Sequence, residues 1–171
     1  MESGVTVKLS LAEFHVAVST ATIRMIASES LGCNSATTYQ RTYLKRLEEE
    51  TIGACGEIAF QKYRGKFFVP SVNTFHREAD VDENIEIRGT ANPKGRLIVR
   101  ENDDDNKVYI FTIVYGDKVD LMGWIWGRDA KKEQFLDNPD KRREAWFVPV
   151  GKLNPMPPNY VNEAPTKKPL I

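Results

Sequence analysis

The residues best suited to chemistry lie in one short stretch, Asp80-Val81-Asp82-Glu83-Asn84-Ile85-Glu86-Ile87-Arg88-Gly89-Thr90. An acidic loop runs into a predicted strand, where Glu86 and Arg88 are two residues apart and so share one face. Ile85 and Ile87 then face the core. Carboxylates beside a cation can hold a divalent metal and a phosphate together, because Mg²⁺ prefers carboxylate, water and phosphate oxygens. The alternative is that the alternating charges mark the exposed face of an edge strand.

Two aspartates compete as the upstream metal ligand of this stretch. Asp80 lies between Ala79 and Val81, which is typical of the entry to a strand. Asp82 lies in Asp82-Glu83-Asn84, which is typical of the tip of a turn. Aspartate is also common in turns for purely structural reasons. We take Asp80 as the candidate ligand.

A third acidic residue, Glu57, lies in the helical pattern Gly56-Glu57-Ile58-Ala59-Phe60. A glutamate on a helix is most often simply exposed. Here small residues flank it and allow another element to approach closely. The pattern therefore favours a Glu57 side chain that faces a neighbouring element instead of bulk water.

In type and order, Glu57, Asp80, Glu86 and Arg88 resemble the acidic and basic residues of the PD-(D/E)XK, or restriction-endonuclease-like, nucleases. The helix acid, the first aspartate and the (D/E)-X-K element correspond to Glu57, Asp80 and Glu86-Ile87-Arg88. The segments GACGEIAFQKYRG, ADVDENIEIRGT and GWIWGRDAKK look like those of small phage-type members. The resemblance covers roughly residues 51–128, less than half of the chain.

The resemblance implies metal-dependent hydrolysis of phosphodiester bonds in DNA or RNA. Asp80, Glu86 and the backbone carbonyl of Ile87 would bind Mg²⁺ or Mn²⁺, with Glu57 holding a water or a second metal. Arg88 replaces the lysine of the motif. A lysine can lower its pKa and help to activate water, whereas an arginine stays protonated and can only stabilise negative charge. The alternative is a non-catalytic regulatory protein that binds nucleic acid or protein on the same fold.

A second group of residues is suited to contact with nucleic acid. Trp126, Arg128 and Lys131 combine an aromatic side chain with cations near a predicted helix start, and such groups can stack on bases and bind phosphates. The alternatives are that Trp124 and Trp126 belong to the core and that the cations are merely solvated. The acidic run Asp103-Asp104-Asp105 could hold a metal, but its neighbours Asn102 and Asn106 favour a hairpin turn.

The first part of the chain is predicted to be helical. Ser10-Leu11-Ala12-Glu13 has the pattern of a capping box, which opens a helix that ends at Gly32. A second helical region is predicted around residues 39–47. Glu48-Glu49-Glu50 is interpreted as a solvated turn, and a further helix is expected over Thr51 to Tyr63.

The second part alternates in the manner of strands. Four strands joined by short turns predict an antiparallel meander, over residues 84–90, 96–100, 108–114 and 119–126. A short helix with Asp129 as its N-cap should run to about Leu136. A last strand, Ala145 to Val150, is expected at a sheet edge because Pro149 cannot donate a hydrogen bond.

The predicted fold is thus α+β, with N-terminal helices on a mostly antiparallel or mixed sheet and a restriction-endonuclease-like core. We expect one domain over residues 1–153 and a proline-rich, extended tail over residues 154–171. The 171 residues are 41% hydrophobic and 28% charged, which suits a single globular domain.

Charge and cysteine content indicate which partners and which cellular compartment to expect. Lys plus Arg and Asp plus Glu number 24 each, which counts against a protein that coats DNA mainly by neutralising phosphates. Cys33 and Cys55 form no disulfide or zinc pattern, so we expect a reducing compartment. Neither a spanning helix nor a secretory signal is predicted, which favours the cytoplasm. Nucleic acid, with DNA foremost, is the expected partner, and a homodimer would suit cleavage of two strands.

Overall fold

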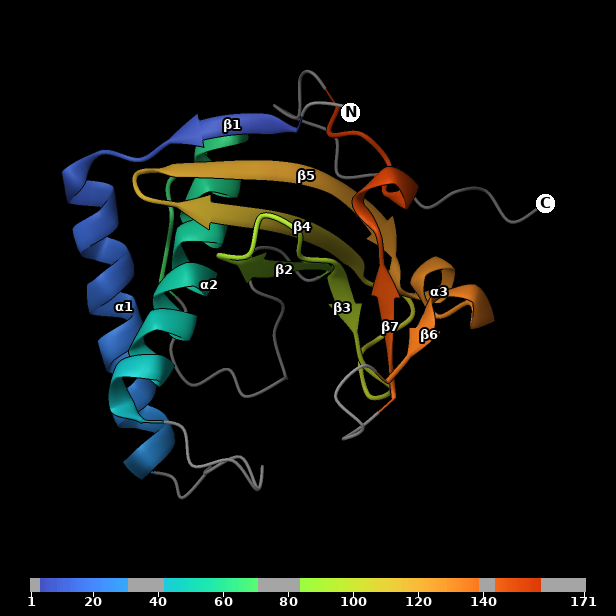
Figure 1. Ribbon diagram of the computed structural model, residues 1–171. Helices are drawn as coiled ribbons and strands as arrows, with labels where there is room; N and C mark the ends of the chain where they lie inside the picture. The colour runs from blue at the N-terminus through green and yellow to red at the C-terminus, as the bar shows by residue number, and fades with distance from the viewer. Residues whose placement is uncertain (1–3, 31–41, 71–83, 139–143, 158–171) are drawn as a thin grey trace.

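The computed structural model of the chain describes residues 4–30, 42–70, 84–138 and 144–157, arranged in an α+β fold (Figure 1). The elements in chain order are β1 (Val5–Lys8), α1 (Leu11–Ser30), α2 (Tyr43–Tyr63), β2 (Ile85–Thr90), β3 (Leu97–Val99), β4 (Val108–Tyr115), β5 (Lys118–Trp126), α3 (Gly127–Ala130), η1 (Glu133–Phe135), β6 (Leu136–Asp137), β7 (Ala145–Val148) and η2 (Val150–Lys152). Helices α1 and α2 lie side by side at one end of the view, the larger sheet lies in the middle, and β3 and β7 lie at the other end. The predicted α+β class is confirmed.

The larger sheet has the strand order β1-β5-β4-β2. Strand β2 pairs with β4 in parallel, with Ile85 opposite Val108, while β1 and β4 each pair with β5 in antiparallel. Strand β3 does not join this sheet. It pairs with β7 in a second sheet of order β3-β7-β6, so the predicted antiparallel meander is wrong.

Burial of strand β4 explains this departure. Val108, Ile110 and Val114 belong to the core that α2 covers. Tyr109 and Phe111 belong to a second core, which also holds side chains of β3 and β7. A strand that is apolar on both faces needs a layer on each face. The β3–β7 sheet supplies the second layer, and β3 is therefore unavailable as a neighbour of β2 in the first sheet.

The helical region differs in extent from the prediction. The capping box is confirmed, since the Ser10 backbone N–H donates to Glu13 Oε2 at 2.6 Å and the Glu13 N–H donates to Ser10 Oγ at 3.2 Å. Helix α2, however, runs without a break through Glu48-Glu49-Glu50, so the turn expected there is wrong. An ion pair between Lys45 and Glu48, one turn apart at 2.8 Å, is compatible with an exposed helical face.

The C-terminal region also differs from the prediction. Strand β7 lies between β3 and β6, so the predicted edge position is wrong. The strand ends at Val148, and Pro149, which cannot donate a hydrogen bond, lies just beyond it. In place of one helix capped by Asp129, α3 begins at Gly127 and the separate turn η1 follows. Asn154 bridges to Trp124, and Met156 is buried in the first core. The packed domain therefore continues past residue 153, at least to residue 157.

Neither α1 nor α2 is long and apolar enough to cross a membrane, and no other helix in the described part of the chain is.

Candidate active site

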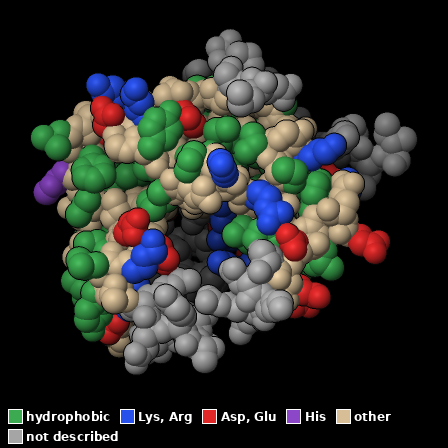
Figure 2. Space-filling model, in the orientation of Figure 1, with side chains coloured by type: hydrophobic (Ala, Val, Ile, Leu, Met, Phe, Trp, Pro, Cys, Tyr) green, Lys and Arg blue, Asp and Glu red, His purple; other side chains and the backbone are tan. Residues whose placement is uncertain are grey.

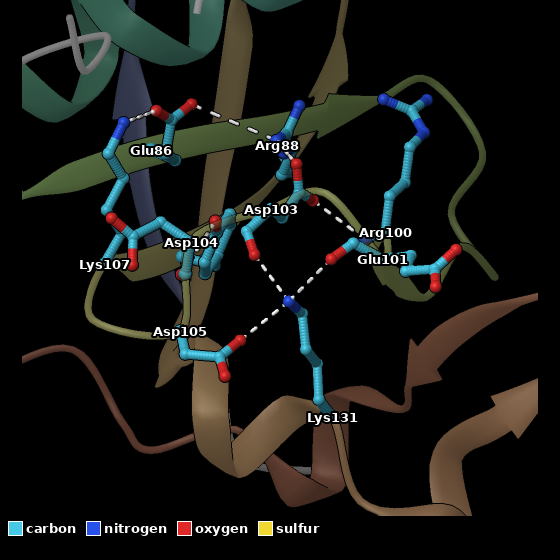
Figure 3. Close-up of polar contacts among 10 residues, drawn as sticks. Glu86, Arg88, Arg100, Glu101, Asp103, Asp104, Asp105, Lys107 and Lys131 are labelled. Carbon is cyan, nitrogen blue, oxygen red and sulfur yellow. Dashed lines mark hydrogen bonds and ion pairs between the residues drawn. The ribbon is translucent and has the colours of Figure 1, made fainter. Parts of the chain in front are cut away.

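The side chain of Glu86 projects from strand β2 and contacts a lysine from another part of the chain. Ile85 and Ile87 are buried in the core against α2, so Glu86 points out of that core. The Nζ atom of Lys107 donates to Glu86 Oε1 at 2.6 Å (Figure 3). The parallel pairing of β2 with β4 causes this contact, because Lys107 directly precedes β4 and the Val108 N–H donates to the Asn84 carbonyl at 2.8 Å. Both side chains are mostly buried, with 14% of Glu86 and 16% of Lys107 exposed.

Arg88 projects beside Glu86, as the period of the strand predicts. Its guanidinium lies 4.0 Å from Glu86 Oε2 and donates to Asp103 Oδ1 at 3.0 Å. The same group lies over the ring of Tyr109, 5.6 Å from the ring centre. Its Nε atom is buried and has no hydrogen-bond partner among the described residues. Arg88 is therefore held in place by Asp103 and Tyr109.

The loop between β3 and β4 is tied together by a second set of contacts. Asp103 Oδ2 accepts from the Arg100 backbone N–H at 2.8 Å. Lys131 donates to the Glu101 and Asp103 carbonyls and pairs with the Asp105 carboxylate at 2.7 Å (Figure 3). The acidic run is thus a turn, but not the predicted hairpin turn, because β3 and β4 belong to different sheets. The turn also has a further effect. By fixing Asp103, it fixes the carboxylate that holds Arg88.

The ring of Tyr109 packs against the guanidinium of Arg88. Burial and the negative charge of Asp103 raise the pKa of its phenol, while Arg88 opposes this shift. The hydroxyl group therefore stays protonated at neutral pH. It donates to the Asp104 carbonyl at 3.2 Å, which adds one more restraint on the same loop.

Glu57 lies inside the protein, as the small residues around it predict, and is 3% exposed. Arg24 of α1 donates to its two oxygens at 2.7 and 2.8 Å. Burial raises the pKa of Glu57, Arg24 lowers it, and the charges of Glu50 and Glu86 raise it further. Glu57 and Glu86 thus interact electrostatically, although the carboxylate of Glu57 is taken up by Arg24.

The expected metal ligands divide between described and undescribed residues. Glu86 and Ile87 lie on β2, whereas Asp80 lies outside the described residues. Within residues 4–30, 42–70, 84–138 and 144–157, no group of three or more His, Cys, Asp or Glu side chains is arranged to hold a metal. The described residues alone do not make a metal site, and the Mg²⁺ or Mn²⁺ site stays a prediction that needs an oxygen donor from the segment before β2.

The residues expected to contact nucleic acid have different surroundings. Trp126 is half-buried and packs against the first core together with Trp124, which is the alternative that the sequence left open. Arg128 is exposed and lies over the ring of Trp126 at 4.9 Å. The ammonium group of Lys131 is engaged by the β3–β4 loop. Of these three residues, Arg128 is the one with an exposed charge.

Two residues of this region had no role in the prediction: Arg24 and Lys107. Lys107 is followed at once by the strongly β-forming segment VYIFTIV. A prediction that β4 pairs with β2 would have indicated Lys107 as a neighbour of Glu86. No local pattern signals Arg24 as the partner of Glu57, because the contact joins two different helices.

Comparisons of the chain with models of protein families, with curated proteins and with solved structures found no match. The arrangement of the side chains therefore carries the functional argument.

Proposed function

We propose that this protein is a metal-dependent nuclease of the restriction-endonuclease-like class, acting on DNA or RNA. The observation that carries the proposal is the pairing of Glu86 with Lys107 next to Arg88. The sequence motif lacks its lysine, since Arg88 stands in that position. Lys107, arriving from the start of the neighbouring strand, supplies an amine next to the same acid.

Each of these side chains has a distinct role in the proposal. Glu86, the Ile87 carbonyl and Asp80 would hold Mg²⁺ or Mn²⁺, which supplies Lewis-acid stabilisation of the phosphoryl oxygens. Lys107 would orient the attacking water and exchange protons with it, which Arg88 cannot do. Arg88, whose side chain is 30% exposed, would donate to the charge that develops on the phosphate. Glu57, which accepts from Arg24 of α1 through both oxygens, would hold α2 against α1 behind the site.

A second candidate function is a non-catalytic protein that binds nucleic acid or protein on this scaffold. One observation favours it: Glu57 and Glu86 are each already paired with a cation of the protein, Arg24 and Lys107. Such pairs balance buried charge without any metal. The two candidates make opposite predictions for metal-dependent cleavage.

The test is cleavage of labelled single- and double-stranded DNA and RNA with Mg²⁺ or Mn²⁺ and with EDTA. Glu86→Gln keeps the shape of the side chain but removes its charge, and Glu101→Gln removes an exposed carboxylate of the nearby loop as the matched control. The nuclease predicts metal-dependent products from the wild type and from Glu101→Gln, and their loss in Glu86→Gln. Circular dichroism would show that each variant is folded. Folded wild type that cuts none of the four substrates would refute the nuclease and favour the binding protein.

A further inference from the structure

A basic cavity lies directly beside the candidate active site. It has a volume of about 550 Å³ and lies between the end of β2, the β2–β3 turn, β3 and one residue each of β4 and β7. In the space-filling view the surface is hollowed near the middle, and Lys and Arg side chains lie at its border together with some Asp and Glu (Figure 2). This volume is within the range of about 300–1,000 Å³ that is usual for small-ligand pockets.

The charge of the cavity has a single sign. Its lining includes four cations and no carboxylate: Arg88, Lys94, Arg96 and Arg100. Arg88 and Arg96 are held from outside the cavity, by Asp103 at 3.0 Å and by Asp137 at 3.1 Å. Lys94 and Arg100 are exposed and have no carboxylate partner among the described residues. In a protein of zero formal net charge, this concentration of positive charge favours an anionic ligand.

The cavity also has an apolar side. Ile98 and Phe147 line it, and the guanidinium of Arg96 lies over the ring of Phe147, 4.7 Å from its centre. A planar guanidinium backed by an aromatic ring is a surface on which a nucleobase can stack. Cations for phosphate beside a stacking surface match the chemistry of a nucleotide better than that of a simple inorganic anion.

The turn that carries Lys94 is fixed by its own hydrogen bonds. The Asn92 side chain accepts from the Lys94 N–H at 2.9 Å, and the Gly95 N–H donates to the Asn92 carbonyl at 2.9 Å. A Cβ atom on Gly95 would lie 2.7 Å from Thr90 Cγ2 and 3.0 Å from the Asn92 carbonyl oxygen, so the turn needs glycine at this position. The cation is thus presented on a preformed turn.

We infer that this cavity binds a single-stranded segment of nucleic acid, with phosphates on Lys94 and Arg100 and a base against Arg96. The inference rests on the proposed function, because Arg88 belongs both to the cavity and to the candidate active site, so that a strand held here has a phosphate next to Glu86. A single strand can place one nucleotide in a cavity of this size, whereas a duplex can touch only its rim. Single-stranded substrate should therefore bind more tightly than duplex of the same length.

The test is fluorescence anisotropy of a labelled single-stranded 12-mer and of its duplex, in EDTA so that cleavage cannot occur. The variant Lys94→Gln/Arg100→Gln removes two exposed charges of the cavity. The control Lys66→Gln/Lys118→Gln removes two exposed charges elsewhere. The wild type and the control should prefer the single strand, and the cavity variant should bind it about tenfold or more weakly. Its log–log salt slope should also fall by about 1.4, at about 0.7 per phosphate contact for single strands.

Equal affinity of the two double variants would overturn the inference, as would a preference of the wild type for duplex or no binding by either strand form. The two assays separate this inference from the proposed function, because binding is measured in EDTA, where no cleavage occurs. Binding that depends on the cavity, together with no cleavage by the wild type, would leave the cavity in place and refute the nuclease alone. Thermal unfolding of each double variant would show that the fold is intact, since all four side chains are exposed.

Discussion

The ammonium group of Lys107 lies 2.6 Å from the carboxylate of Glu86, although Glu86 lies on β2 and Lys107 directly precedes β4. We expect Lys107→Met to lower the rate of metal-dependent cleavage by about 100-fold or more, the usual effect of losing a positioned proton donor or acceptor. Lys107→Arg should keep the ion pair and the thermal stability but lose most of the activity, because an arginine does not exchange its proton. Cleavage rates and melting temperatures of both variants check this. Lys118→Met, at an exposed site, is the control, and wild-type activity in Lys107→Met would contradict the prediction.

The buried pair of Arg24 and Glu57 should dominate the contact between the two helices. Arg24→Met leaves the 3% exposed Glu57 without that partner, and breaking a buried pair by removing one member typically costs about 3–5 kcal/mol. Replacing both residues with methionine should recover much of this loss, because no charge is then left buried. Urea unfolding of the two single variants and the double variant gives the coupling energy. A double variant as unstable as the sum of the single variants would show that the pair is not coupled.

Two glycines of α2 offer a matched comparison. A Cβ atom on Gly56 would lie 2.7 Å from Thr112 Oγ1 and 3.0 Å from Ile87 Cγ2, whereas a Cβ atom on Gly53 would meet nothing within 4 Å. Gly56→Ala should therefore lower the free energy of unfolding by about 1–3 kcal/mol through overpacking. Gly53→Ala should raise it by up to about 1 kcal/mol through helix propensity. Chemical denaturation measures both, and the same sign of change in the two variants would show that α2 does not approach the sheet as described.

The capping box predicts a pH dependence of stability. Burial raises the pKa of Glu13, but hydrogen bonds from the Ser10 backbone N–H and from Lys62 outweigh it and lower the pKa below its ordinary value. Between the folded and the unfolded pKa, the native state binds fewer protons than the unfolded state. The stabilisation is therefore complete above about pH 5 and is lost as the pH falls through the folded pKa.

Glu13→Gln tests this dependence, because glutamine can still accept the capping hydrogen bond. The free energy of unfolding of the wild type should exceed that of the variant at pH 7, and the difference should shrink on acidification below about pH 4. In a Lys62→Met background the pH-dependent part should be smaller, since one of the two groups that lower the pKa is gone. A difference that grows on acidification would contradict the assigned shift.

Local patterns in the sequence were enough to predict several parts of this protein. Ser10 and Glu13 lie one helical turn apart, which is all that a capping box requires. The alternation of Ile85 and Ile87 with Glu86 and Arg88 was enough to predict which side chains share a face. These features depend on the fixed geometry of one helix or one strand, and neighbours along the chain determine them.

The tertiary structure alone decided the contacts between elements. The sequence predicted that β2, β3 and β4 would follow one another in an antiparallel meander. Both faces of β4 are apolar and each needs a covering layer. In the structure β3 therefore belongs to the second sheet, and β2 pairs with β4 in parallel. That choice brings Lys107 to Glu86 and places the basic cavity between the two sheets. Strand pairing and long-range ion pairs arise from competition among many possible packings of the whole chain, so no spacing within a single segment reveals them.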